Sequence, residues 1–350
     1  MDSWYLDNLV CPRDHCELRL QGNTLLCPHD HGYPVVDGTP VMLLSDVRQT
    51  MVVANTSINQ ARAQHDDRGF YVESLGLSDE EKRGILQLAA NKTSKVDPAV
   101  AYLIGATNGI AYKHLIGKLG EYPIPEMRLP FGRGQSLLDI GCNWGRWCIA
   151  AARKGYGPIG LDPSLGAIMA AKRVATEEGV DIKYIVGDAR FLPFSAATIN
   201  NVFSYSVVQH LSREDAANVV VEIGRILKPG GRSLVQMPTV FGLRSLYHQA
   251  RRKFREANGF DVRYWTIPEL RRLFSSQIGP TEISVDCFFG IGLQYSDLHL
   301  MPLTHKTVII ASEILRRASH LLPPLTVLAD SVYVSSLKQT TGYSRSEVEC

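Results

Sequence analysis

The stretch LLDIGCNWGRWCIAAARKG, residues 137–155, decides the fold. Its apolar start predicts a buried strand, Gly141 and Gly145 predict a tight turn, and the residues that follow have the spacing of a helix. A strand, a glycine-rich turn and a helix form the place where parallel α/β sheets bind nucleotide-like ligands. Glycine-rich turns also occur without a ligand, so the surrounding sequence has to distinguish a ligand-binding turn from an ordinary tight turn.

Short apolar runs and helical patterns alternate on either side of this stretch, from Ser136 to about Met237. Strands are predicted at SLLDIG, YGPIGLD, IKYIVGD, INNVFSYS and RSLVQMP, and helices at WCIAAARKG, AIMAAKRVATEEG and REDAANVVVEIGRILKPGG. This alternation predicts an α/β fold with a parallel sheet and helices on both faces. Two later segments, TEISVDCFF and DSVYVSSLK, are predicted to add an antiparallel edge.

Polar residues end the predicted strands. Asn143 takes the place of a glycine in the turn, because asparagine tolerates the left-handed backbone conformation. Asp162 follows the turn by about 20 residues, where a carboxylate accepts hydrogen bonds from ribose hydroxyls. Trp147 is expected to pack the helix against the sheet or the N-terminal helices. Trp144, at the mouth of the turn, is expected to close over a ligand or to face a second substrate.

Together, the segments LLDIGCNWG, GLD, GDAR, SYSVVQHL and ILKPGG resemble the class I S-adenosylmethionine-dependent methyltransferases over residues 135–240. The resemblance is expected to extend to 340 through the antiparallel final strands. The resemblance implies a Rossmann-like seven-stranded sheet and S-adenosylmethionine as cofactor. A nicotinamide dehydrogenase shares the sheet, but its G-x-G-x-x-G spacing is not met. The cofactor-binding residues that the resemblance implies are Asp139, Gly141, Cys142, Asn143, Gly145, Asp162, Pro163, Asp188, Ala189, Ser204, Tyr205 and Ser206.

Methyl transfer from an activated donor needs positioning above all, and a general base helps when the acceptor carries a proton. His210, in VVQHL, is the candidate base, and packing or helix capping is its alternative role. Cys142 and Cys148 are expected to be small buried side chains, not nucleophiles. The strand end reads SYSV and not Asn-Pro-Pro-Tyr, which disfavours a nucleobase amine as acceptor.

The N-terminal region carries three of the seven cysteines, at positions 11, 16 and 27. Cys11 and Cys16 form one pair and Cys27 and His31 a second, and two such pairs on short turns suit a tetrahedral zinc ion. A region of this size has a small core, which a metal would stabilise. His15 and His29 are alternative ligands. The stretch GYPVVDGTPVMLL resembles the small zinc-ribbon-like proteins that activate tRNA and rRNA methyltransferases.

Bulk properties limit the class of protein. The net charge of +2 gives no overall attraction to nucleic acid, and 45% hydrophobic residues suit a globular core. The N-terminus does not read as a secretory signal and no apolar run has the length of a membrane span, so a cytoplasmic protein is expected. The expected divisions are a zinc-ribbon-like domain at 1–45, a helical linker or cap at 46–125, the methyltransferase domain at 126–340 with helical insertions near 240–266 and 291–326, and a flexible tail at 341–350.

Two segments bear on the substrate. Residues 244–266 are basic with interleaved aromatics, and we expect a solvated helix anchored by Leu246, Tyr247 and Phe254, with phosphate binding as the alternative. Residues 303–329 are expected to form a packed core helix, with a lid, a dimer face or a membrane-surface helix as alternatives. The expected acceptor is a metabolite, glycan or lipid-type molecule. An RNA methyltransferase and a non-catalytic cofactor-binding scaffold are the alternative functions.

Overall fold

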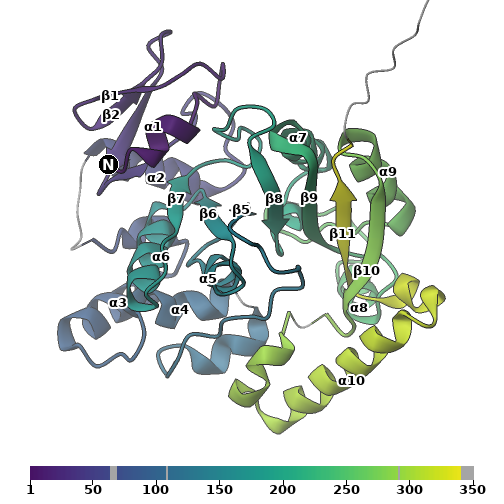
Figure 1. Cartoon of the computed structure of the whole chain (residues 1–350). Coiled ribbons are helices and arrows are strands. Elements are labelled where there is room, and N and C mark those ends of the chain that lie inside the picture. Colours follow the sequence, from purple (N-terminus) through teal and green to yellow (C-terminus); the bar gives the residue numbers. More distant parts are fainter. Residues whose placement is uncertain (64–68, 108, 291, 340–350) are drawn as a thin grey trace, which may run out of the picture.

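The computed structural model describes residues 1–63, 69–107, 109–290 and 292–339, so the tail expected at 341–350 lies outside the described residues. A seven-stranded mixed sheet with strand order β10-β11-β9-β8-β5-β6-β7 forms its centre (Figure 1). The strands are β5 (Ser136–Ile140), β6 (Gly157–Asp162), β7 (Lys183–Val186), β8 (Ile199–Ser204), β9 (Leu227–Pro238), β10 (Thr281–Cys287) and β11 (Ser331–Leu337).

Five neighbouring strands are parallel, and β11 lies antiparallel to both β9 and β10. The predicted parallel sheet and its antiparallel edge are therefore confirmed. The carboxyl ends of β5, β6 and β8 meet at one edge of the sheet, which brings together the turn after Ile140, the acid at the end of β6 and the residues after Ser204. Ligands of open α/β sheets bind at such an edge.

Helices cover both faces of the sheet. The helices that flank it are α5 (Arg146–Arg153), α6 (Leu165–Glu177), α7 (Arg213–Ile226) and α9 (Ile267–Gln277). Because side chains alternate along a strand, Leu138 and Ile140 of β5 enter the core that contains α7 and α9, whereas Leu137 packs with Trp147 of α5. All of β5 except its first residue is buried, as expected for a central strand.

The N-terminal region covers part of the face on which α7 and α9 lie. It comprises helix α1 (Trp4–Asn8) and an antiparallel sheet of β1 (Arg19–Gln21), β2 (Thr24–Leu26), β3 (Gly32–Val36) and β4 (Thr39–Pro40). The amide of Met42 donates to the carbonyl of Val186 on β7 at 2.7 Å, and Leu9 and Leu25 share a core with Leu138. The region therefore packs directly on the large sheet.

The region expected to be a helical cap is helical. It contains α2 (Val52–Ala63), η1 (Val72–Leu75), α3 (Asp79–Asn91), α4 (Pro98–Thr107) and η2 (Ile110–Leu115). Ser78 and Glu81 form the predicted capping box at the start of α3. Ser57 of α2 donates to the carbonyl of Pro163 at 2.8 Å and accepts from the amide of Leu165 at 2.9 Å, so the cap is bound to the loop after β6.

One predicted helix is shorter than expected. α7 ends at Ile226, and Leu227–Gly231, which the sequence pattern assigned to the helix, belong to β9. Pro229 lacks the amide hydrogen that a continuing helix needs. The β9 backbone also passes close to β8, since a Cβ on Gly231 would lie 2.8 Å from the carbonyl oxygen of Asn200. The pairing with β8 therefore replaces the helix.

The two substrate-related segments are more exposed than predicted. Helix α8 (Leu243–Arg251) leaves its expected anchors exposed, with Tyr247 at 57% and Phe254 beyond it at 69%.

η4 (Tyr295–Leu300) precedes helix α10 (Leu303–Ser319), and η5 (Pro323–Leu328) follows it. Among the residues of α10, only Ile309 and Ser319 are buried. The prediction of a packed core helix is wrong here, because the apolar residues of α10 lie on more than one side. Figure 1 shows α10 at the margin of the molecule. Among the described helices, none is long and apolar enough to cross a membrane.

Candidate functional site

Three residues of the turn after β5 have the left-handed backbone conformation. Gly141, Asn143 and Gly145 have φ values of 75°, 47° and 81°. Asn143 therefore adopts the conformation for which it was predicted to replace glycine, and its Oδ1 accepts the amide of Trp144 at 2.8 Å. Gly141 also has to be small, because a Cβ there would lie 2.3 Å from Cγ2 of Val207. The turn thus leads into the N-terminus of α5, whose amides point toward the edge of the sheet.

Asp162 ends β6 beside this turn. Its Oδ2 accepts the amide of Asn143 at 3.0 Å, and its Oδ1 accepts the amide of Ser164 at 2.9 Å. Burial raises the pKa of Asp162 to about 6, and these two amides oppose the rise. Within the described part of the chain no cation pairs with it. A carboxylate has about four acceptor positions, so two remain for a ligand.

Asp139 and the two cysteines lie inside the core behind the turn. Asp139 is 1% exposed, its pKa is raised by burial to about 7, and its Oδ2 accepts the thiol of Cys148 at 3.4 Å. Burial raises the pKa of Cys142 to about 11 and that of Cys148 well above its usual value. Thiols that stay protonated are poor nucleophiles, which agrees with the expectation that both cysteines are buried and inert.

Asp188, after β7, has a cationic partner that the sequence analysis did not assign. Its Oδ2 receives Arg190 Nη2 at 2.7 Å, and both side chains are only 9% exposed. Arg190 also donates to Asp215 at 3.0 Å and to the carbonyl of Arg48 at 2.8 Å. Arg190 is the last residue of the motif GDAR, and this short spacing from Asp188 is the sequence signal that could have identified the pair. Ala189 lies between the two charged residues and is half-buried.

The residues after β8 form the third part of the edge. Ser204 donates to the carbonyl of Ile140 at 3.0 Å, which joins the ends of β8 and β5. Tyr205 donates to Asp286 at 3.1 Å and accepts Gln294 Nε2 at 2.7 Å. Ser206 has a φ of 61° and its amide donates to Gln236 at 2.9 Å, so this segment is held by side chains of β9 and β10 and of the loop before η4.

His210 lies in the short helix η3 (Val208–His210), and its ring is fixed by two contacts. Its Nδ1 donates to the carbonyl of Phe260 at 2.8 Å, and the two rings stack with centroids 3.8 Å apart. Its Nε2 is therefore the unprotonated nitrogen and accepts Gln209 Nε2 at 3.2 Å. Burial lowers the pKa of His210, and Arg263 lowers it further. The imidazole is thus held in its neutral, basic form.

The two tryptophans of the motif lie in different surroundings. Trp147 packs on Phe203 and Tyr205 with centroids 4.9 Å away in both cases, which confirms its predicted contact with the sheet. Trp144 is 1% exposed, and its Nε1 finds no hydrogen-bond partner within the described part of the chain. Its ring lies 5.8 Å from that of Tyr122, so the cap covers it.

Arg146, the first residue of α5, is a second buried cation that sequence reasoning missed. Its Nη2 pairs with Asp297 at 3.0 Å, and Asp297 also accepts the hydroxyl of Tyr112. Its Nε has no hydrogen-bond partner among the described residues. Trp144 and Arg146 thus each carry a buried N–H group that has no hydrogen-bond partner among the described residues, and both residues lie at or next to the turn.

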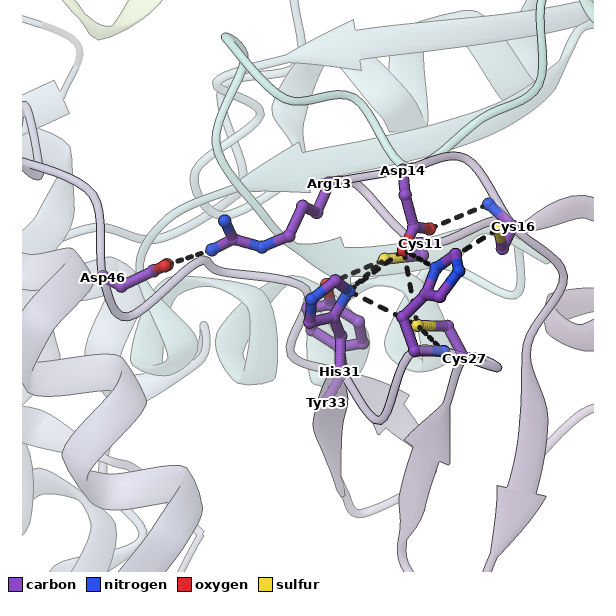
Figure 2. A network of polar contacts seen from close by, with 9 residues as sticks. Cys11, Arg13, Asp14, Cys16, Cys27, His31, Tyr33 and Asp46 are labelled. Atoms are coloured by element: carbon purple, nitrogen blue, oxygen red, sulfur yellow. Dashed lines mark hydrogen bonds and ion pairs between the residues drawn. The ribbon is translucent and has the colours of Figure 1, made fainter.

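The N-terminal cysteines gather into a compact cluster (Figure 2). One ligand atom from each of Cys11, Asp14, Cys27 and His31 lies within 4.8 Å of the others. The sulfur atoms of Cys11 and Cys27 are 3.5 and 3.4 Å from Nδ1 of His31, and that nitrogen is 3.1 Å from Oδ2 of Asp14. Three of the four predicted metal ligands are therefore adjacent.

Cys16 is the predicted ligand that the structure separates from this group. It belongs to a second group with Asp14 and His29, in which its sulfur lies 3.8 Å from Nδ1 of His29. Asp14 takes its place because Oδ1 of Asp14 accepts the amide of Cys16 at 3.0 Å, which turns Oδ2 toward His31. Asp14 is a candidate ligand that the cysteine and histidine spacing does not indicate.

The central part of the chain is similar in sequence to known methyltransferases. A family model for a methyltransferase domain matches residues 137–231. The ubiquinone biosynthesis O-methyltransferase of Chelativorans sp. is 33% identical over 111 residues, 32% of this chain and 43% of the relative. The demethylmenaquinone methyltransferase of Bacillus licheniformis is 34% identical over 123 residues, 33% of this chain and 51% of the relative. The chain thus spans about half the length of these relatives or less.

Among solved structures, phosphoethanolamine N-methyltransferase 2 of Haemonchus contortus in complex with S-adenosylmethionine aligns with a TM-score of 0.44 and 19% identity, over 76% of this chain and 61% of that one. The family match runs from β5 to the start of β9, where the turn, Asp162 and the residues after β8 lie. The chain therefore contains a class I S-adenosylmethionine-dependent methyltransferase domain.

Proposed function

We propose that this chain transfers a methyl group from S-adenosylmethionine to a small-molecule acceptor. The observation that carries the proposal is the buried Asp162, which is fixed by the amides of Asn143 and Ser164 and lacks a cation among its described partners. A buried carboxylate with unused acceptor positions fits two ribose hydroxyls. When bound, the cofactor supplies a methyl group that is already activated on a sulfonium.

The residues proposed to hold the cofactor line the edge of the sheet. Gly141 and Gly145 add no side chains to the turn, and the side chain of Asn143 is held on the amide of Trp144. Asp188 accepts the amide, Nε and Nη2 of Arg190 at 2.9, 3.1 and 2.7 Å, which leaves one of its about four acceptor positions for an adenine amino group. The remaining proposed contacts are Asp139, Cys142, Pro163, Ala189, Ser204, Tyr205 and Ser206.

His210 is proposed to receive a proton from the acceptor at Nε2. The ring is oriented by the carbonyl of Phe260, and its neutral form is favoured by burial. Gln209 would exchange its hydrogen bond to Nε2 for an acceptor hydroxyl or amine. This role requires the acceptor to enter between η3 and the segment that carries Phe260.

A metabolite, glycan or lipid-type acceptor is supported by the two relatives named above, which are methyltransferases of ubiquinone biosynthesis and of demethylmenaquinone. The net charge of +2 also favours a small acceptor over a nucleic acid. An RNA acceptor is the second candidate, and the basic segment around α8 is the observation that favours it. Transfer of labelled methyl groups into a fractionated cell extract tests both. Label in the small-molecule or lipid fraction supports the proposal, and label in RNA alone refutes it.

We also propose that the N-terminal cluster holds a structural zinc ion through Cys11, Cys27, His31 and Asp14. Bond lengths of about 2.0–2.3 Å give tetrahedral ligand–ligand separations of roughly 3.3–3.8 Å. The distances from His31 to Cys11 and Cys27 are 3.5 and 3.4 Å, which fit. Burial raises the pKa of Cys11, so zinc binding would have to release its proton.

A further inference from the structure

Helix α10 exposes a stripe of mostly apolar side chains. Leu303, Ile310 and Ile314 follow one another at intervals of seven and four residues, so they lie along one side of the helix, and Leu321 comes two residues after its end. Their exposed fractions are 80%, 42%, 61% and 85%. Thr307 and Arg317 fill the intermediate positions of the same stripe and are also exposed. Residues at this spacing bury their side chains against a partner in most helices.

The stripe continues onto the neighbouring elements. Leu322, Val327 and Leu328 of the η5 region are 58%, 46% and 55% exposed. The start of α8 lies next to the end of this region, because the amide of Ser245 donates at 2.7 Å to Asp330, two residues after Leu328. The exposed apolar residues that α8 and its flanks add are Phe241, Leu243, Leu246, Tyr247 and Phe254. We call residues 241–256 and 303–328 together the α8–α10 face.

This face is basic. Residues 241–256 contain five lysines and arginines and one acid, and residues 303–328 contain three and one, which gives the face a net charge of +6. The whole chain has +2, so the remainder carries −4. The acid of α10, Glu313, is paired with both Arg316 and Arg317. Positive charge is thus concentrated where the apolar side chains are exposed.

We propose that the α8–α10 face binds the surface of an anionic lipid bilayer. Apolar side chains among arginines and lysines are what an interfacial segment uses, since the first enter the headgroup–acyl boundary and the second meet lipid phosphates. A second copy of the chain on the same face would place two basic surfaces against each other, which charge repulsion opposes. Lipid phosphates supply the complementary charge.

The face lies beside the candidate active site. Segment 252–265 runs from the end of α8 to Trp265, and on the way Phe260 stacks on His210. Contact with a bilayer would therefore place lipid next to the acceptor side of the site. The membrane contact itself stands apart from the proposed methyl transfer, because binding to vesicles is measured without turnover.

The test is sedimentation of the full chain with phosphatidylcholine vesicles that contain or lack phosphatidylglycerol. The wild-type chain is expected to sediment with the anionic vesicles at least tenfold more strongly, and to lose this binding at high salt. I310E/I314E is expected to reduce binding at least tenfold. Arg251→Gln with Lys253→Gln should reduce it about 25-fold, at about fivefold for each basic residue.

V52E/F131E is the matched control, because Val52 and Phe131 are 83% and 76% exposed but lie outside this face. It should bind as the wild type does. Equal binding of I310E/I314E and V52E/F131E overturns the proposal, and so does a wild-type chain that stays in the supernatant. A wild-type dimer that I310E/I314E converts to a monomer, without vesicle binding, assigns the face to a second copy and overturns it as well.

Discussion

The amide of Asn143 donates to Oδ2 of Asp162 at 3.0 Å, and this bond joins the turn after β5 to the end of β6. Asn143 has the left-handed conformation, with a φ of 47°, that points its amide toward the acid. Its own side chain holds the amide of Trp144. One residue therefore fixes both the turn and the carboxylate that the proposed cofactor site needs.

Asp162→Ala is expected to weaken S-adenosylmethionine binding at least tenfold. The variant removes the acceptor for the ribose hydroxyls, and a hydrogen bond to a charged group contributes about 1.5–3 kcal/mol. Isothermal titration calorimetry measures the affinity, and thermal unfolding followed by circular dichroism checks that the variant is folded. An affinity equal to that of the wild type would exclude Asp162 from the cofactor site.

The raised pKa of Asp162 makes stability and cofactor affinity respond to pH in opposite directions. The pKa is about 6 in the folded chain and 3.8 as the ordinary value, so the folded state binds the proton more readily. The contribution of Asp162 to the free energy of unfolding should therefore rise as pH falls from about 6 to about 4. Cofactor affinity should fall over the same range, because the carboxylate is lost. The Asp162→Ala variant should lack the affinity change and show a smaller stability change, because Asp139, whose pKa burial raises to about 7, still contributes over this range. A wild-type affinity that is constant from pH 8 to 5 would contradict this.

Gly141→Ala is expected to destabilise the chain and to weaken cofactor binding. Its φ is 75°, and a Cβ would lie 2.3 Å from Val207. Gly230→Ala is the matched control, because Gly230 has a φ of 77° with open space where a Cβ would lie. Both variants share the backbone penalty, roughly 1–2 kcal/mol, and only Gly141→Ala adds the steric contact. Chemical denaturation should give Gly141→Ala the larger loss, and equal losses would show that Val207 moves aside freely.

The fold could be predicted from the sequence because its strands are short apolar runs that end in polar residues. The boundary between α7 and β9 could not be predicted in this way. Pro229 and the two glycines after it stop the helix locally, but residues 227–231 become part of β9 because β9 pairs with β8 and Gly231 approaches the backbone of Asn200. That pairing joins segments distant in sequence, and no local pattern contains it.

The residues of the candidate sites could also be predicted only where the local sequence determines their role. Residues close to one turn were predicted together, as Asn143 and Gly145 were. Arg190 and Arg146 were missed because their partners become visible only in the folded chain. The spacing of α10 predicted an apolar helix, but spacing alone does not say whether another element covers the apolar side, and in the described structure Leu303 and Ile314 stay exposed.

His210→Gln is expected to lower turnover about 100-fold, the lower end of the contribution of a general base. Cofactor affinity should not change. The pKa of His210 is lowered by burial, so the wild-type rate should fall only below pH 6.5, and the variant should lack this acidic limb. Phe260→Ala is the control for packing, because it removes the ring on which His210 stacks and keeps the imidazole. Equal losses in both variants, with no change in the pH profile, would assign His210 a packing role.

Substitution of single cysteines distinguishes the two ligand sets of the N-terminal cluster. Cys11→Ser and Cys27→Ser remove ligands in either set, so each should lower bound zinc well below one ion per chain and reduce thermal stability. Cys16→Ser should retain zinc if Asp14 is the fourth ligand, because the Cys16 sulfur lies outside the group around His31. Metal analysis of the purified chains measures the stoichiometry. Zinc lost in Cys16→Ser but kept in Asp14→Asn would restore the set first predicted from the spacing, and a wild-type chain without stoichiometric metal would refute both sets.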